Sequence, residues 1–237
     1  MIPRIIHYCW FGRGSMPETA LRSIESWHRY MPDWKYVLWN EDNFDVSLYT
    51  YTQEAYDARK YAFVSDVVRL YALKEYGGIY LDVDFEVYKS FDELLSNEAF
   101  AGFEGSKHNP VMMGVLGSVA KGEWVSGQLS RYVNRHFMVG GKPDLTTNVK
   151  FVTEDMVARG FLPNGREQDF MDLHVYPVDY FCPRLTTGEY RRTSNTFCEQ
   201  ISNTSSWAEL RLKDRLFRWL PLWMRIVLIK IKRAIFG

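Results

Sequence analysis

Cysteine is scarce in this chain of 237 residues. Cys9, Cys182 and Cys198 lie far apart, and no Cys-x-x-Cys spacing occurs. An odd number of widely spaced cysteines argues against both a disulfide framework and a thiolate zinc site. A reducing compartment therefore fits best, and we expect the protein in the cytoplasm.

Long apolar runs and an excess of charge are also lacking. No uninterrupted apolar stretch is long enough to span a bilayer. No charged and then apolar leader precedes residues 2–8, which already have the character of a strand, so we expect no signal sequence. The 29 basic residues balance 29 acidic ones, and we expect no nucleic-acid partner.

The balance of charge is uneven along the chain. Residues 208–237 hold eight Lys and Arg against two Asp and Glu, whereas the first 207 residues hold 21 against 27. With 46% hydrophobic and 16% aromatic residues, the chain suffices for one sizeable core. We therefore expect one folded domain over residues 1–207, followed by a basic tail over residues 208–237.

The first forty residues have the pattern of a βαβ unit. Residues 2–12 form a β-branched and aromatic run that ends at a glycine and predicts a first strand. Residues 17–30 carry apolar side chains at helical spacing after a proline, and residues 36–39 form a second short apolar run. This order predicts an α/β fold whose central sheet is mostly parallel and is flanked by helices.

Two side chains of the first strand have alternative interpretations. His7 lies inside the run and is expected to be a hydrogen-bonded core histidine rather than a metal ligand. Trp10 lies at the carboxyl end, where ligands bind in α/β sheets, although a core position is the simpler interpretation.

Residues 77–84 form the stretch around which the chain is organised. Two glycines and an apolar run lead into Asp82 and Asp84, which is typical of a buried strand that ends in an acidic loop. If the extended geometry persists through Val83, both carboxylates face the same side. They would then suit a hard divalent cation, Mg²⁺ or Mn²⁺, although the alternative is a pair of acids facing water.

Residues 60–76 form the clearest predicted helix, because Val64, Val67 and Val68 recur at helical spacing before Gly77. Asp66 and Arg69 lie one turn apart beside this stripe. They are either a surface ion pair, which contributes about 0.2–0.5 kcal/mol, or a rigid polar cluster that contacts a sugar. The second interpretation is favoured because the helix leads directly into the acidic strand.

Five stretches together resemble the family 32 glycosyltransferases, which include a sugar-binding Asp-x-Asp region also seen in large glucosylating bacterial toxins and fungal Golgi mannosyltransferases. The stretches are residues 2–12, 26–27, 39–41, 62–69 and 77–84, in the family's order. The resemblance implies a GT-A fold, a nucleotide-sugar donor, Mn²⁺ or Mg²⁺, and transfer with retention of anomeric configuration.

The resemblance also implies roles for single residues. Trp10 would stack on the nucleotide base. Asp84 would ligate the metal. The donor contacts would come from Ser65, Asp66, Arg69, Tyr80 and Asp82, with Asp82 assisting at the metal.

The evidence in the second half of the chain is weaker. Residues 99–103 read as a strand and residues 122–137 as a helix. Asn148 stands where relatives more often have a Thr-Gly-Pro turn; it is expected either to meet a sugar hydroxyl or to cap a helix. Relatives supply a further metal contact from a histidine, and the toxins from a glutamate, shortly before a Ser-Trp pair, whereas residues 195–207 of this chain contain no histidine.

That missing contact has to be replaced by neutral oxygen ligands, for which Gln200, Ser202 and Asn203 are candidates, with Asn203 and Ser206 assigned to the metal. Ser206 and Trp207 match the family's Ser-Trp pair and are expected to meet the metal and the diphosphate of the donor. A weakly metal-dependent enzyme is therefore an open alternative.

Residues 208–237 alternate bulky apolar residues with Arg and Lys around Pro221. A basic amphipathic helix of this kind is typical of the anionic membrane interface, whereas a docked terminal helix rarely needs eight basic groups. We therefore expect peripheral association with the inner face of the membrane.

The resemblance therefore implies a retaining hexosyltransferase. The donor is expected to be a UDP-hexose, with GDP-mannose possible, and the acceptor a saccharide, preferably lipid-linked, in surface polysaccharide biosynthesis. One alternative is a haloacid dehalogenase-like phosphohydrolase, because residues 81–87 also resemble the start of that family, with Asp82 as nucleophile. Another is a non-catalytic protein that binds nucleotide-sugars.

Overall fold

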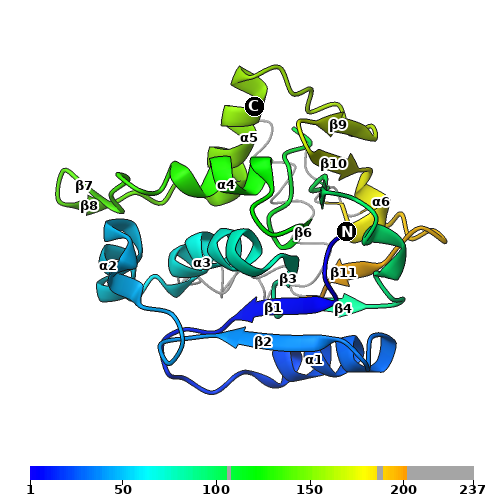
Figure 1. The fold of residues 1–237 in the computed structure, drawn as a ribbon, viewed down its shortest axis with the longest axis horizontal. Helices are drawn as coiled ribbons and strands as arrows, with labels where there is room; N and C mark the ends of the chain where they lie inside the picture. The colour runs from blue at the N-terminus through cyan, green and yellow to red at the C-terminus, as the bar shows by residue number, and fades with distance from the viewer. Residues whose placement is uncertain (106–107, 186–188, 202–237) are drawn as a thin grey trace, which may run out of the picture. The chain divides into compact units, whose positions relative to one another are not determined.

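The fold is built on a seven-stranded sheet with the order β2-β1-β3-β6-β5-β10-β9 (Figure 1). It is seen in a computed structural model that describes residues 1–105, 108–185 and 189–201. Strands β2, β1, β3, β5 and β10 run in one direction, whereas β6 and β9 run in the opposite one. The strands of this sheet are β1 (Ile5–Cys9), β2 (Lys35–Trp39), β3 (Gly78–Leu81), β5 (Ala99–Gly102), β6 (Val115–Ser118), β9 (Gln168–Phe170) and β10 (Leu173–Tyr176).

Two small antiparallel pairs stand beside this sheet. The first joins β4 (Phe85–Val87) to β11 (Cys198–Gln200), and the second joins β7 (Met138–Val139) to β8 (Lys142–Pro143). The described helices are α1 (Glu18–Tyr30), α2 (Thr50–Asp57), α3 (Tyr61–Tyr76), α4 (Glu123–Ser130), α5 (Asn148–Ala158) and α6 (Val178–Phe181), with 3₁₀ turns at Val46–Leu48 and Asp92–Leu94.

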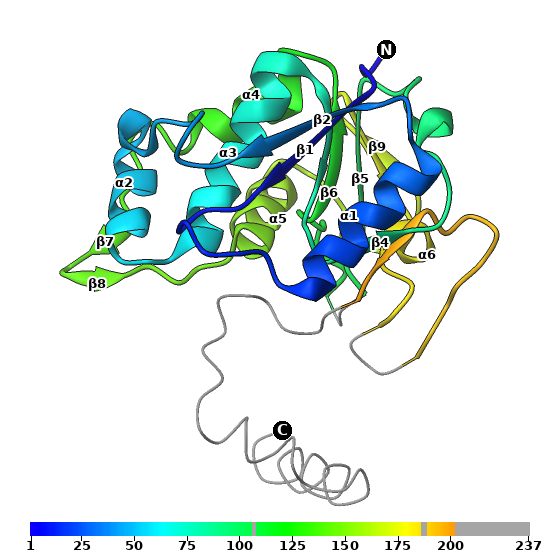
Figure 2. The ribbon, with the colours of Figure 1, turned by 90° about the horizontal axis from the view of Figure 1, so that it is seen from below.

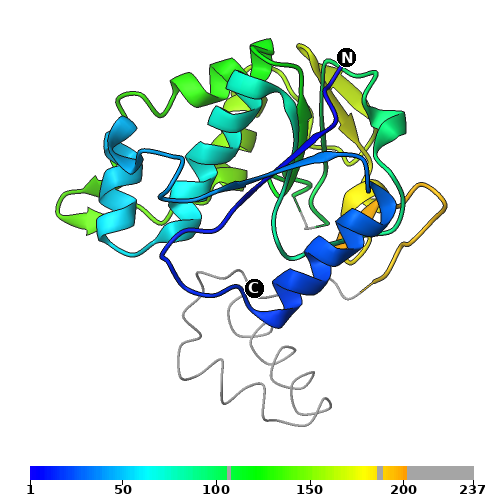
Figure 3. The same cartoon turned by 60° about the horizontal axis from the view of Figure 1, so that its bottom comes forward.

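Helices cover both faces of the sheet and create two cores. Helix α1 lies on one side of β1 and β3, where Trp27 packs with Ile6 and Leu81. Helices α2, α3, α4 and α5 gather on the other side, around Val64 and Tyr80 (Figure 2). The β7–β8 hairpin lies next to α2 (Figure 3). Apolar side chains that point to both faces are what an α/β sheet requires of its central strands.

The predicted βαβ unit is confirmed. Strands β1 and β2 pair in parallel from Ile5 opposite Lys35 onwards, and α1 connects them. His7 is a core histidine, as expected: it accepts a hydrogen bond from Trp39 Nε1 at Nδ1 (3.0 Å), and its Nε2 lies 2.8 Å from the Gly77 carbonyl oxygen. Burial lowers the pKa of His7 to about 4, so the ring is neutral.

The helix expected over residues 60–76 is also confirmed, as α3. It is buried on more than the predicted stripe, because α2 and α4 pack against it as well as the sheet. It ends at Gly77, whose φ of 63° is readily adopted only by glycine and whose N–H bonds to the Leu73 carbonyl.

Two expectations need correction. The helix predicted over residues 122–137 is α4, which ends at Ser130 and is followed by turns. The extended geometry required through Val83 is absent, because β3 ends at Leu81 and a turn follows in which the Phe85 N–H bonds to the Asp82 carbonyl (3.1 Å). Strand alternation therefore does not set the directions of Asp82 and Asp84.

Within the described ranges, no helix is long and apolar enough to cross a membrane. The three cysteines are buried and free. The basic tail over residues 208–237 lies outside the described residues.

Candidate active site

Several of the predicted site residues lie near the edge of the sheet where β1 and β3 end. Asp82 directly follows β3, and its N–H donates to the Gly114 carbonyl just before β6 (2.8 Å). The turn that contains Asp84 then leads into β4. This edge carries the carboxyl ends of parallel strands, which is where ligands bind in open α/β sheets.

Arg69 is the centre of this site. Its guanidinium lies 3.2 Å from Asp66 Oδ1 and 3.4 Å from Asp82 Oδ1, and it donates further hydrogen bonds to the carbonyl oxygens of Ser65 and Met113. Tyr80 donates its hydroxyl hydrogen to Asp82 Oδ1 (2.7 Å), and its ring lies under the guanidinium. One arginine on α3 thus joins two acids that are sixteen positions apart in the sequence.

Burial distinguishes this network from a surface ion pair. The exposed fraction of the side chain is 6% for Arg69 and 11% for Asp66, against 32% for Asp82. The surface alternative for Asp66 and Arg69 is therefore wrong. Only Asp82 of the three is substantially open to solvent.

Burial shifts the pKa values of the charged groups in this network. Burial raises the pKa of Asp66 to about 7, and Arg69 opposes this shift while Asp82 adds to it. Burial also acts to lower the pKa of Arg69, but Asp82, Tyr80 and Asp66 outweigh it and hold the pKa above its usual value. The guanidinium is therefore a fixed positive charge beside Asp82.

Asp84 is held by a different element. Gln200, the last residue of β11, donates from Nε2 to Asp84 Oδ2 (2.8 Å), and the Ile201 N–H donates to the Asp84 carbonyl (2.9 Å). The antiparallel pairing of β11 with β4 places Gln200 opposite Phe85, which is the next residue after Asp84.

Trp10 and Ser65 border this edge. Trp10 follows β1, is only partly buried, and donates from Nε1 to the Gly14 carbonyl (2.7 Å). It belongs to neither buried core, so the simpler interpretation as a core residue is wrong. Ser65 is half-buried on α3, and its hydroxyl bonds to the Tyr61 carbonyl (3.2 Å).

Asn148 is the first residue of α5 and is not its cap. The cap is Thr147, whose hydroxyl accepts from the Lys150 N–H (3.3 Å). Asn148 is 7% exposed, its Oδ1 accepts from the Val149 N–H (2.7 Å), and its Nδ2 has no partner among the described residues.

Two further buried donors lie near Asp66 and were not foreseen. The hydroxyl of Tyr132 and Nη1 of Arg135 have no partner in the described part of the chain. The charge of Arg135 opposes the rise in the pKa of Asp66, and the charge of Asp66 adds to the rise in the pKa of Tyr132. Arg135 binds Asp144 (3.0 Å), which precedes α5. No sequence signal pointed to either residue, because they come from the turns after α4.

The oxygen atoms at Asp82 and Asp84 fit a hard divalent cation. Both side-chain contacts of Asp82 fall on Oδ1, and Oδ2 faces Gly114, where a Cβ atom would approach to 2.9 Å. The glycine thus keeps room beside a carboxylate oxygen of the kind that Mg²⁺ and Mn²⁺ prefer. Among the residues that the structure describes, no three His, Cys, Asp or Glu side chains form a metal-binding group.

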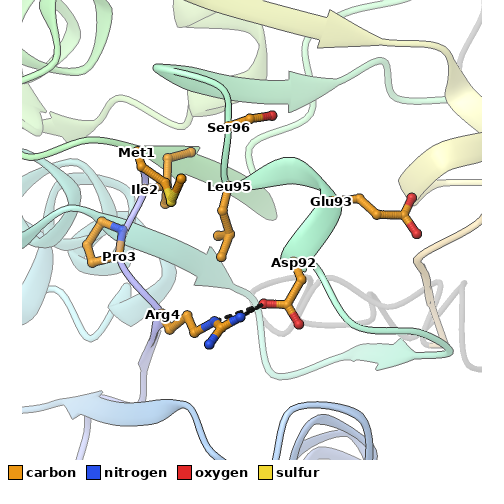
Figure 4. Close-up of a pocket in the computed structure, with 8 residues that line it drawn as sticks. All are labelled: Met1, Ile2, Pro3, Arg4, Asp92, Glu93, Leu95 and Ser96. Atoms are coloured by element: carbon orange, nitrogen blue, oxygen red, sulfur yellow. Dashed lines mark hydrogen bonds and ion pairs between the residues drawn. The ribbon is translucent and has the colours of Figure 1, made fainter.

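A hollow lies away from the predicted site residues. It is found where the chain enters β1, around Arg4, Asp92 and Glu93, and the ion pair between Arg4 and Asp92 crosses it (Figure 4). Asp82 and Asp84 lie at the opposite, carboxyl ends of the strands. We therefore assign no part of the site to this hollow.

Residues 17–101 match the family described as the glycosyltransferase sugar-binding region containing the DXD motif. Over these residues the chain is similar to this glycosyltransferase family. The match includes Asp66, Arg69, Asp82 and Asp84, which the structure brings together or places in adjoining turns. The resemblance to the family 32 glycosyltransferases is thereby confirmed.

Curated relatives align with a similar share of this chain. Inositol phosphoceramide mannosyltransferase 3 of Schizosaccharomyces pombe is 36% identical over 103 residues, which are 42% of this chain and 29% of the relative. A mannosyl phosphorylinositol ceramide synthase of Saccharomyces cerevisiae is 28% identical over 125 residues, 51% of this chain and 32% of the relative. The chain thus spans about a third of the length of these relatives.

A solved structure shows the same fold. A glycosyltransferase involved in glycosylation of the major capsid of PBCV-1 superposes with a TM-score of 0.50 at 16% identity, over 86% of this chain and 95% of that one. The predicted α/β fold of the GT-A type, with a mostly parallel sheet between helices, is confirmed.

Three predicted site residues, Asn203, Ser206 and Trp207, lie outside the described residues. Gln200 is described, and its amide N–H faces Asp84, so the atom nearest the acid is a donor rather than a metal ligand.

Proposed function

We propose that this glycosyltransferase moves a hexose from a nucleotide-sugar to a saccharide acceptor with retention of anomeric configuration. The observation that carries the proposal is the buried network in which Arg69 holds Asp66 and Asp82 at the carboxyl end of β3. Paired donors and acceptors that are fixed by packing suit a hydroxyl-rich ligand, because little further ordering is needed on binding.

The residues divide the work of binding. Asp82 and Asp66 accept hydrogen bonds from donor hydroxyls, and Arg69 keeps both carboxylates in place and compensates their charge. Trp10, partly exposed at the end of β1, offers an aromatic surface for the base. A divalent cation, Mn²⁺ or Mg²⁺, held by Asp84 and Asp82, would offset the charge that grows on the departing nucleoside diphosphate.

Of the possible donors, UDP-hexose is favoured. GDP-mannose is the second candidate, because one relative is named a mannosyltransferase and another a mannosyl phosphorylinositol ceramide synthase. Those names also refer to a ceramide-linked acceptor, which supports a lipid-linked saccharide as the acceptor class here. Residues 208–237, with eight basic residues, would bring the protein to an anionic membrane surface.

The phosphohydrolase alternative gains no support from the site. That family places its acidic motif on the first strand, whereas here β1 and β2 both precede the strand β3 that leads into Asp82. A non-catalytic binding protein is distinguished from a transferase by turnover of the donor.

Thermal protection tests the proposal directly. UDP- and GDP-sugars, each with Mn²⁺ or with EDTA, are screened for a rise in melting temperature, because a ligand bound only by the folded state stabilises it. We expect one class of nucleotide-sugar to protect with Mn²⁺ and to be slowly hydrolysed. Asp82→Asn is the matched variant and should lose the protection. Absence of protection by every donor would contradict the proposal.

A further inference from the structure

Asp84 is fixed from two directions by the end of β11. The side chain of Gln200 donates from Nε2 to Asp84 Oδ2 (2.8 Å), and the next N–H, of Ile201, donates to the Asp84 carbonyl (2.9 Å). The β11–β4 register sets Gln200 opposite Phe85, which brings its amide within hydrogen-bonding distance of the preceding residue, Asp84. A carboxylate can only accept hydrogen bonds, so the amide must turn its N–H toward Asp84.

A neutral amide orients Asp84 without adding charge. A carboxylate at position 200 would add a second negative charge beside Asp84, and the two carboxylates could bind one cation together. The N–H of Gln200 adds no charge and occupies one of the lone pairs of Asp84. The amide therefore fixes the geometry of the site and contributes no attraction for a cation.

The attraction of Asp82 for a cation is weakened by its neighbours. Arg69 lies 3.4 Å from Asp82 Oδ1 and carries a full positive charge, and Tyr80 donates a hydrogen bond to the same oxygen. The third acid of the neighbourhood, Asp66, is paired with the same guanidinium (3.2 Å). Among the described side chains, this one guanidinium offsets part of the charge of Asp66 and Asp82.

We propose that Gln200 is a positioning residue that makes binding of the divalent cation depend on the diphosphate of the donor. Among its described residues, the protein presents only a few oriented carboxylate oxygens, part of whose charge Arg69 offsets, and the diphosphate supplies further negative charge and oxygen ligands. Cation and nucleotide therefore bind cooperatively, each strengthening the other by the same factor. The inference rests on the proposed function.

Two measurements with the whole chain test this dependence. Electron paramagnetic resonance follows Mn²⁺ binding to the nucleotide-free protein, and equilibrium dialysis follows protein-bound UDP and GDP with Mn²⁺ or with EDTA. We expect weak Mn²⁺ binding to the free wild-type protein and at least a tenfold tighter binding of one diphosphate when Mn²⁺ is present.

Variants at position 200 separate positioning from simple packing. Gln200→Glu should bind Mn²⁺ at least tenfold more tightly without nucleotide, because two adjacent carboxylates favour a cation between them. Its melting temperature should fall in EDTA and recover with Mn²⁺. Gln200→Leu keeps the bulk but loses the amide, and should weaken Mn²⁺-dependent diphosphate binding severalfold.

A matched control exists on another element. Gln53 on α2 donates from Nε2 to Asp57 Oδ1 (2.9 Å), which repeats the same pair of groups at a position outside the site. Gln53→Glu makes the same chemical change and should leave Mn²⁺ and diphosphate binding unaltered.

The results separate the inference from the proposed function. If wild type binds a diphosphate with Mn²⁺ but Gln200→Glu binds Mn²⁺ no more tightly than wild type or Gln53→Glu, the inference is wrong and the proposed function stands. Tight Mn²⁺ binding by nucleotide-free wild type also overturns the inference alone. If wild type binds neither diphosphate and hydrolyses no donor, both fail.

Discussion

Arg69 shows how much a single side chain determines in this molecule. It lies on the apolar helix α3 and is 6% exposed, yet its guanidinium contacts two carboxylates and two carbonyl oxygens. Truncation of one partner in a buried ion pair leaves the other charge unpaired, which costs about 3–5 kcal/mol. Arg69→Ala is thus expected to lower stability as well as activity, and conservative changes at its partners are the cleaner probes.

Asp84→Asn tests the cation site at the scale of one oxygen atom. The asparagine retains an oxygen that can accept from Gln200, so the fold and the melting temperature should be nearly unchanged. Transfer should fall by on the order of 100-fold, because an electrostatic contact to the leaving group is lost. Donor turnover is measured with Mn²⁺ and with EDTA. Full activity of the variant in EDTA would show that Asp84 holds no cation.

Asp66→Asn tests the electrostatics of the network through pH. Burial raises the pKa of Asp66 from 3.8 to about 7, so between these values the folded state holds a proton that the unfolded chain releases. The Asp66 contribution to the free energy of unfolding therefore decreases as the pH rises from 3.8 to about 7, and is constant above.

The measurement for Asp66 is urea unfolding of wild type and Asp66→Asn from pH 4 to pH 8. The stability of the variant relative to wild type should rise across the lower part of this range and level off above pH 7. A difference that stays constant with pH would mean that Asp66 is ionised throughout and that its pKa is not raised.

At the scale of elements, the sequence predicted the first strands and helices correctly, but it predicted only some of the contacts in the site. The βαβ unit and helix α3 followed from apolar spacing, because such helices and strands are determined by the face they bury. Helix α4 was predicted too long, since the residues after Ser130 are apolar enough for a helix but fold into turns.

The contacts that complete the site could not be predicted from spacing. The Met113 and Gly114 carbonyl oxygens, which hold Arg69 and Asp82, come from the chain just before β6, and Gln200 comes from β11. These partners are backbone atoms or lie more than thirty residues from the motif. Only the arrangement of the strands brings them together.

The close approach of Gly114, just before β6, to Asp82 can be tested by substitution. A Cβ atom at Gly114 would lie 2.9 Å from Asp82 Oδ2 and 2.7 Å from the ring of Phe85, which is buried and cannot move away easily. Gly114→Ala should therefore cost about 1–3 kcal/mol of stability and weaken donor binding. Urea unfolding and donor titration measure the two effects.

Gly127 is the control for this substitution. It lies inside α4, and a Cβ atom there would have no neighbour within 4 Å. Gly127→Ala should stabilise the protein by roughly 0.5–1 kcal/mol through helix propensity, with donor binding unchanged. Equal behaviour of the two variants would mean that Gly114 provides no close approach to Asp82.

At the scale of the whole molecule, the distribution of charge separates the body from the tail. Residues 1–207 hold 21 Lys and Arg against 27 Asp and Glu, whereas residues 208–237 hold eight against two. Truncation after Trp207 therefore removes a net charge of plus six and leaves an acidic body. Each Lys or Arg near an anionic surface contributes roughly 1 kcal/mol of binding, so a few engaged side chains suffice to hold the protein there.

The truncated protein should keep donor binding and slow donor hydrolysis, because Arg69, Asp82 and Asp84 are unchanged. It should lose binding to anionic vesicles and most transfer to a lipid-linked acceptor. Sedimentation at low salt measures the binding, with zwitterionic vesicles and added salt as controls, since screening weakens electrostatic attraction. If the full-length protein stays in the supernatant with anionic vesicles, or the truncated protein pellets equally well, the tail does not bind the membrane and the acceptor must be reached in another way.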